Sequence, residues 1–213
     1  MKNLFSFIFV FSSICALGQI KEGHIFYEVA IDNSGKEDQT TAALLETSTF
    51  EIYFKKNKCR SDFNMSRMMN IIGIVDGESN ISLVLMDGSI AQRAEIKTYN
   101  QGSTNSSMKV IKTEKEKIIA GYLCALYQLK DTKGNVSNFW FSDQIEFQMD
   151  GLPFFPGFDK GIPLEFESYN NGMKMTMTAI EVTDGLDPQL DLFKMVIPDG
   201  YTLNDPEGLL DKK

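Results

Sequence analysis

Apolar and polar residues alternate along most of the chain, and this period predicts β-strands rather than helices. Ile25, Tyr27, Val29 and Ile31 occupy every second position near the start of the chain. Side chains two positions apart point to the same face of a strand, so these four residues form one apolar face. The segment 50–54 repeats the pattern. The alternation therefore indicates a mainly β protein in which one face of a sheet is buried.

Short polar turns separate the expected strands. Asp76-Gly77-Glu78 and Asn170-Asn171-Gly172 each lie between two apolar segments, which is typical of β-hairpins. Because about ten such strands follow one another at close spacing, we expect a large curved antiparallel sheet that forms an open half-barrel. Helix signals are confined to two short segments, 189–195 and 206–210. The sequence thus predicts a β domain with one or two short helices.

Residues 1–18 have the features of a secretory signal peptide: a positively charged start, a long apolar run and small residues at its end. The run is too short to span a bilayer. Lipid attachment to Cys15 is disfavoured, because bacterial processing needs a small residue before the modified cysteine and Ile14 precedes it. We therefore expect an exported, unlipidated protein whose residues 19–213 form a single domain.

The chain is acidic, with 29 acidic and 21 basic residues and a net charge of −8. Such an excess repels phosphate backbones and anionic membrane surfaces. After the signal segment, no apolar run in the sequence reaches the length of a membrane-spanning helix. We therefore expect neither a nucleic acid partner nor a transmembrane segment in the exported chain.

His24 is the single histidine of the sequence. A zinc site with several histidines is therefore excluded, and a Ser-His-Asp or Cys-His site would have to use this residue. Its position in the first expected strand favours a solvent-facing role. The acidic residues show no spacing that singles out a catalytic pair. We expect a non-enzymatic protein with no catalytic residue, no metal and no cofactor.

Two cysteines, Cys59 and Cys124, remain after removal of the signal segment. An exported protein meets an oxidising compartment, in which these residues can form a disulfide. Alternatively, both are small buried hydrophobic residues that never meet. The distance between their Cα atoms decides between the two, and the sequence does not give it.

Met173, Met175 and Met177 alternate with polar residues, so one strand face carries three thioethers. Soft sulfur ligands can hold Cu(I) in an exported protein. Same-face neighbours stand about 7 Å apart along a strand, however, so a single ion would need ligands from another segment. A flexible apolar wall is the more common use of methionine, and it is the interpretation that we favour.

The segment 151–163 is framed by glycine and proline and holds Phe154, Phe155 and Phe158. Loops rarely expose three aromatic rings to water, so these rings either plug the end of the core or form a lid over an apolar cavity. Trp140 is either a core residue or part of a cavity wall, and the sequence pattern does not decide between the two. If the loop is a lid, the concave face of the curved sheet would form a ligand-binding cavity.

A series of short motifs runs through residues 23–201. The motifs are GHIFYEV, IYFKKNKCR, LMDG, KIIAGYLCALYQLKD, FWFSDQI, GLPFFPG and KMTMTAIEV. In this order they resemble a family of exported proteins of unknown function from Gram-negative bacteria. That family is similar in fold to the LolA and LolB lipoprotein carriers, in which an unclosed antiparallel barrel holds acyl chains. The resemblance implies a half-barrel in the periplasm or at the outer membrane.

Two functional hypotheses follow. In the first, an exported, non-enzymatic half-barrel binds a lipid or another apolar ligand in its concave face, with the aromatic loop, Trp140 and the methionine strand as walls. In the second, the protein is an envelope structural or protein-interaction module whose core is filled and which binds no small molecule. Its partner would then be another protein of the cell envelope.

Overall fold

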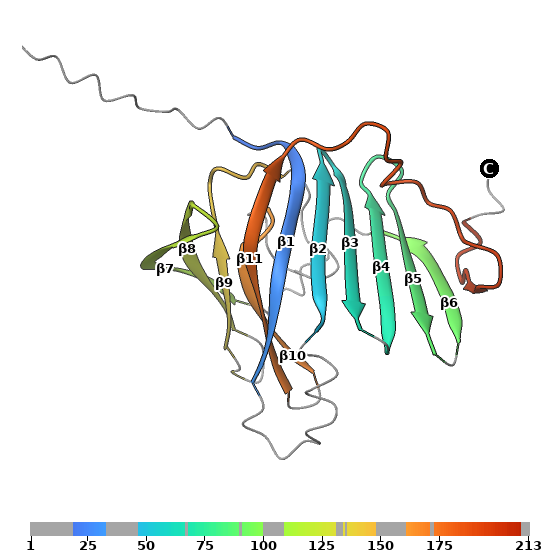
Figure 1. Cartoon of the computed structure of the whole chain (residues 1–213), viewed down its shortest axis with the longest axis horizontal. Helices are drawn as coiled ribbons and strands as arrows, with labels where there is room; N and C mark the ends of the chain where they lie inside the picture. The colour runs from blue at the N-terminus through green and yellow to red at the C-terminus, as the bar shows by residue number, and fades with distance from the viewer. Residues whose placement is uncertain are drawn as a thin grey trace, which may run out of the picture.

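The computed structural model of the chain contains a single sheet of twelve strands (Figure 1). The structure describes residues 19–32, 47–66, 68–89, 91–99, 109–130, 134, 136–147, 161–170 and 173–209. The strands are β1 (Glu22–Asp32), β2 (Thr49–Lys55), β3 (Lys58–Met65), β4 (Met69–Asp76), β5 (Ile81–Gly88), β6 (Gln92–Thr98), β7 (Lys109–Ile119), β8 (Tyr122–Lys130), β9 (Val136–Phe141), β10 (Glu165–Asn170), β11 (Met173–Asp184) and β12 (Thr202–Asn204).

The strand order in the sheet is β12-β6-β5-β4-β3-β2-β1-β11-β10-β9-β8-β7. Strands β12 and β6 run parallel, and every other pair is antiparallel. Because β7 and β12 are the two ends of the sheet, the sheet is not closed into a barrel. The prediction of a mainly β, antiparallel fold is confirmed, and the unclosed sheet is consistent with a half-barrel.

The β4–β5 hairpin forms at the turn that the sequence predicts. The Asp76 carboxylate accepts hydrogen bonds from the backbone N–H groups of Glu78, at 2.9 Å, and Ser79, at 3.4 Å. Lys58 Nζ on the neighbouring strand β3 donates to the other carboxylate oxygen at 3.2 Å. The turn residue therefore fixes the local backbone and ties the hairpin to the next strand.

A row of side chains crosses the sheet on the face that we call the inner face. Its members lie directly opposite one another in successive strand pairs, and they are Tyr27, Phe50, Phe63, Ile71, Met86 and Arg93. Directly opposed residues project from the same face of a sheet. The row therefore begins with aromatic rings in the middle of the sheet and ends with a thioether and a guanidinium near the β6 edge.

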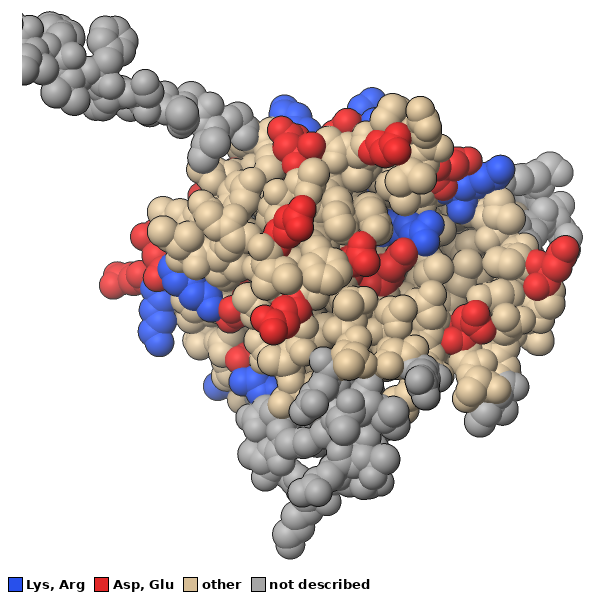
Figure 2. Space-filling model, in the orientation of Figure 1, with Lys and Arg blue, Asp and Glu red and all other residues tan. Residues whose placement is uncertain are grey.

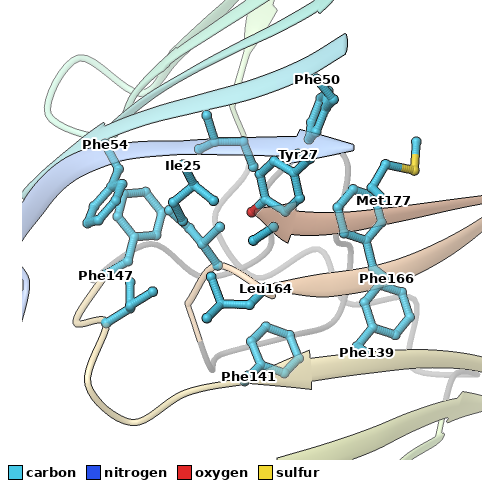
Figure 3. Packing of buried hydrophobic residues seen from close by; sticks show 14 of the residues in the cluster. Ile25, Tyr27, Phe50, Phe54, Phe139, Phe141, Phe147, Leu164, Phe166 and Met177 are labelled. Atoms are coloured by element: carbon cyan, nitrogen blue, oxygen red, sulfur yellow. The ribbon is translucent and has the colours of Figure 1, made fainter. Parts of the chain in front are cut away.

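The aromatic part of the inner face is filled by the main core (Figure 3). The rings of Phe50 and Phe166 lie 5.8 Å apart, and the ring of Phe166 stacks on that of Phe139 at 6.4 Å. Tyr27 is completely buried among them, and its hydroxyl donates a hydrogen bond of 2.8 Å to the Pro163 carbonyl. Burial raises the pKa of Tyr27 well above its ordinary value. This half of the curved sheet is a packed core.

The opposite, outer face of β5 and β6 is covered by the segment 186–209, which we call the C-terminal strap (Figure 1). Met195, Ile197 and Tyr201 of the strap pack against a cluster that contains Leu83 and Ile96. The strap contains β12, which pairs with β6 and is the last strand at that end of the sheet. The sheet is therefore buried on its inner face in the middle and on its outer face near the β6 edge.

Within the described residues, neither of the two short helices expected from the sequence is present. In the first segment, the Asp187 carboxylate accepts from the backbone N–H of Gln189 and forms a turn. In the second, the Asp205 carboxylate accepts from the backbone N–H of Leu209. The apolar side chains of this part of the chain pack against the sheet, and this tertiary contact outweighs the weak local helix signals. Turns instead leave the strap extended, so that its apolar side chains can follow the sheet.

The surface shown in Figure 2 carries more acidic than basic side chains, in agreement with the net charge of −8. Among the described residues, no helix has the length and apolar character needed to cross a membrane.

Candidate functional site: a methionine-lined pocket

Met175 and Met177 are part of the main core, with 8% and 5% of their surface exposed. They lie opposite Ile31 and Val29 of β1, so both thioethers pack against apolar side chains. The side chain of Met173 lies outside the described residues, as do Phe154, Phe155 and Phe158. The described methionines of β11 thus pack within a filled core.

Trp140 is half-buried at the margin of the main core. Alternation along β9 places it on the face opposite Phe139 and Phe141, which are buried in the core. Lys117 Nζ lies 4.4 Å from the centroid of the indole ring and also forms an ion pair of 2.7 Å with Glu165. The indole therefore packs under a lysine on the outer side of β9, and it is not part of the inner face.

Cys59 and Cys124 are both buried free thiols in the structure, so no disulfide joins them there. Burial raises the pKa of the Cys124 thiol to about 11, and it raises the pKa of Cys59 as well. Since the thiolate is the reactive form, both thiols are held in their unreactive state at neutral pH. This arrangement corresponds to the interpretation of both residues as small buried hydrophobes.

His24 lies on the outer face, where its Nε2 is 2.8 Å from Glu51 Oε2. The Tyr53 hydroxyl donates to the same oxygen at 2.6 Å, and its ring stacks on the imidazole with centroids 4.4 Å apart. Burial, and then the hydrogen bond to Glu51, raises the pKa of Tyr53. These contacts hold the imidazole against the sheet surface on the side opposite the inner face.

The inner face has a cavity of about 360 Å³ at the end where β3 turns into β4 and β5 into β6. Four of its lining residues are methionines, and Arg93 lies on its lining as well. The residues used below are Met65, Met68, Met69, Met86, Gly88 and Arg93. We call this cavity the methionine pocket. It continues the inner-face row beyond Phe63 and Ile71, where the aromatic packing ends.

The strand register explains why the pocket is lined by thioethers. Met65 and Met69 lie directly opposite each other next to the β3–β4 turn, which Met68 closes with a hydrogen bond from its N–H to the Met65 carbonyl. Met86 lies opposite Ile71 in the β4–β5 pair, two residues from Gly88, and so is a diagonal neighbour of Met69 on the same face. Directly opposed side chains have Cβ atoms about 5 Å apart, and diagonal neighbours about 7 to 8 Å, both within reach of a methionine.

Gly88 provides the space for the pocket. It lies directly opposite Met69 in the β4–β5 pair, where any other residue would project a side chain from the inner face. A Cβ atom placed there would meet the Ala91 carbonyl oxygen at 3.6 Å and the Met68 carbonyl oxygen at 3.9 Å, both ordinary contacts. The position therefore tolerates a side chain, and the glycine leaves the volume empty.

A second cavity, of about 180 Å³, lies by β7 and β8 and is lined by charged groups that include Lys112, Glu116 and Asp143. Its volume is below the roughly 300 to 1,000 Å³ of typical ligand sites, whereas the methionine pocket falls within that range. The methionine pocket is therefore the better candidate site.

Sequence reasoning concentrated on the alternating methionines of β11 and missed those of the pocket. The available signal was the run Met65-Ser66-Arg67-Met68-Met69 between two expected strands. Its partner Met86 becomes a neighbour only through the register of β4 with β5. The run could have been noticed from the sequence, but the pocket depends on that long-range register.

No family model matches the chain, and no curated protein matches it. Among solved structures, PNGF-II in space groups C2 and P21 aligns with TM-scores of 0.52 and 0.53, identities of 15% and 14%, and coverage of 89% and 90% of this chain. The chain spans only 32% of PNGF-II, and at this identity the likeness concerns the fold alone. MucB aligns with a TM-score of 0.37, 11% identity and coverage of 84% of this chain and 60% of MucB, a likeness too low to support an argument.

Proposed function

We propose that this protein is an exported, non-enzymatic binding protein that holds a small apolar ligand in the methionine pocket. The observation that carries the proposal is a cavity of about 360 Å³ whose lining includes four methionines. Methionine side chains are flexible and polarizable, and proteins use them on surfaces that accept apolar partners of varied shape. A pocket of this size and character suits an alkyl chain better than a polar metabolite.

The packing of the main core supports this location over the rest of the inner face. Tyr27, Phe50, Phe139 and Phe166 fill the middle of the curved sheet with their own rings. A ligand there would have to displace packed aromatic side chains, at a cost of several kcal/mol. The methionine pocket needs no such displacement, because Gly88 leaves it open.

The proposal is tested by titrating the protein with octanol in a calorimeter. Wild type should bind, and Gly88→Val should bind at least about tenfold more weakly, because the new side chain fills the pocket. Ser79→Val is the matched control: it adds the same side chain in an exposed turn at the other end of the β4–β5 hairpin. Equal octanol binding by the folded Gly88→Val variant and wild type would contradict the proposal.

The filled main core also favours a second candidate function, a protein-interaction module of the cell envelope. Ile118 and Leu123, opposite each other at the β7–β8 hairpin, are 73% and 56% exposed and offer an apolar contact to a partner. This candidate gains support if wild type fails to bind any alkyl probe while Ile118→Ser weakens co-purification of a specific envelope protein.

A further inference from the structure

We infer that the ligand of the methionine pocket carries an anionic head group, a carboxylate or a phosphate, which Arg93 binds at the edge of the pocket. This inference rests on the proposed function and specifies the class of ligand. It predicts a single-chain amphiphile whose tail lies among the thioethers and whose head meets the guanidinium.

The position of Arg93 follows from the β5–β6 register. Arg93 lies directly opposite Met86, so the two side chains project from the same face with Cβ atoms about 5 Å apart. Its neighbour Ala94 points to the outer face, where it is buried under the C-terminal strap. The aliphatic stem of Arg93 can therefore lie along the thioether of Met86 while its charged end reaches water.

The guanidinium of Arg93 has no ion-pair partner among the residues that the structure describes. On the same face and strand, Glu95 lies 3.6 Å from Lys97 and is paired with it. The carboxylate of Asp87 accepts a hydrogen bond from Gln92, and both residues alternate to the outer face. By contrast with Arg93, the guanidinium of Arg60 is paired, because it donates two hydrogen bonds of 2.7 and 2.9 Å to the Asp62 carboxylate.

An arginine in this position selects for a particular ligand chemistry. Guanidinium binds carboxylates and phosphates through two parallel hydrogen bonds, and it does so better than an ammonium group. The chain as a whole has a net charge of −8, which repels anions elsewhere on the surface. An apolar cavity with an available cation at its edge therefore favours an anionic amphiphile over a neutral one.

The test compares three probes with the same tail: octanoate, octyl phosphate and octanol. Each is titrated by calorimetry into wild type, Arg93→Gln, Arg93→Lys and Lys97→Gln. The affinity of the anionic probes for Arg93→Gln should fall about two- to fivefold, as for an exposed charged contact. The affinity for octanol should fall less than the affinity for either anion, and Arg93→Lys should restore only part of the loss for the anions. Lys97→Gln removes a cation from the same strand and face, about 13 Å away, and should leave all three affinities unchanged.

If Arg93→Gln loses affinity for only one of the two anions, octanoate or octyl phosphate, the inference is supported and the head group is identified. If wild type binds octanol as tightly as both anions and Arg93→Gln changes none of the affinities, the inference is wrong while the proposed function stands. An equal loss for octanol in the folded Arg93→Gln variant would also overturn it, because Arg93 would then act through its stem. If none of the three probes binds to wild type, the proposed function itself fails.

Discussion

Gly88 lies directly opposite Met69 across the β4–β5 pair, and the missing side chain opens the methionine pocket on the inner face of the sheet. A glycine inside a strand lowers stability, because it has no side chain to pack and loses more backbone freedom on folding. A larger residue would fit at this position, so the glycine leaves the pocket open at a cost in stability.

The first prediction concerns the stability of Gly88→Ala. The added Cβ meets only ordinary contacts, and the backbone of Gly88 is not in the left-handed region. We therefore expect the free energy of unfolding to increase by about 0.5 to 1 kcal/mol, measured by urea denaturation. Gly121→Ala is the comparison. Gly121 has a φ of +86°, which alanine rarely adopts, so this substitution should lower the free energy of unfolding of the protein. A loss of stability for Gly88→Ala would show that the glycine serves the backbone and not the cavity.

The second prediction concerns the hydrogen bond from the buried Tyr27 hydroxyl to the Pro163 carbonyl. Tyr27→Phe leaves that carbonyl without its donor inside the core, so the free energy of unfolding should fall by about 1 to 3 kcal/mol. Tyr169→Phe removes the hydroxyl of an exposed tyrosine and should change the free energy of unfolding by less than about 0.5 kcal/mol. Equal effects of the two substitutions in urea denaturation would contradict the packing described for the main core.

The third prediction concerns acid stability. Burial acts to raise the pKa of the Asp76 carboxyl, but the hydrogen bonds from the Glu78 backbone, Lys58 and the Ser79 backbone outweigh it and lower the pKa. The unfolded state therefore binds more protons at this site, and the stability from Asp76 is lost as pH falls through its folded pKa.

Asp76→Asn should consequently make the free energy of unfolding fall less steeply with decreasing pH, measured by urea denaturation from neutral pH to about pH 3. Asp191→Asn, at a side chain that is 74% exposed, serves as the control and should leave the slope unchanged. An unchanged slope in Asp76→Asn would argue against the hydrogen bonds assigned to this turn.

The fourth prediction concerns the two buried cysteines. Free thiols with raised pKa values should react slowly with a thiol reagent in the folded protein and rapidly after denaturation. For protein that begins at residue 19, we expect two reactive thiols per chain in denaturant without a reductant. If thiols become reactive only after reduction, Cys59 and Cys124 are joined in the isolated protein, as one of the two interpretations of the sequence allows.

The alternation of apolar residues was sufficient to predict a mainly β, antiparallel fold, because side chains on a buried sheet face recur at every second position of a strand. The hairpin at Asp76 could be predicted for a local reason, since the carboxylate bonds the backbone of its own turn. The middle of β7 could not be predicted, because residues 112–117 carry charged or polar side chains on both faces. Neither could the C-terminal strap, whose extended course depends on the distant cluster around Leu83.

The candidate site was less accessible to sequence reasoning than the fold. Three residues from separate segments, Met69, Met86 and Arg93, become neighbours only when β4, β5 and β6 pair in one register. A shift of one residue would turn every one of these side chains to the other face. The sequence alone therefore showed that methionines are abundant, and it did not show which of them line a pocket.

The most direct measurement of the central claim uses protein labelled with ¹³C in its methionine methyl groups, titrated with octanoate and followed by NMR. The pocket methyls of Met65, Met69 and Met86, assigned by Met→Leu substitution, should shift progressively and saturate. The core methyls of Met175 and Met177 should stay in place. Shifts confined to the core methyls, or no saturable shift in the pocket methyls, would contradict binding in the methionine pocket.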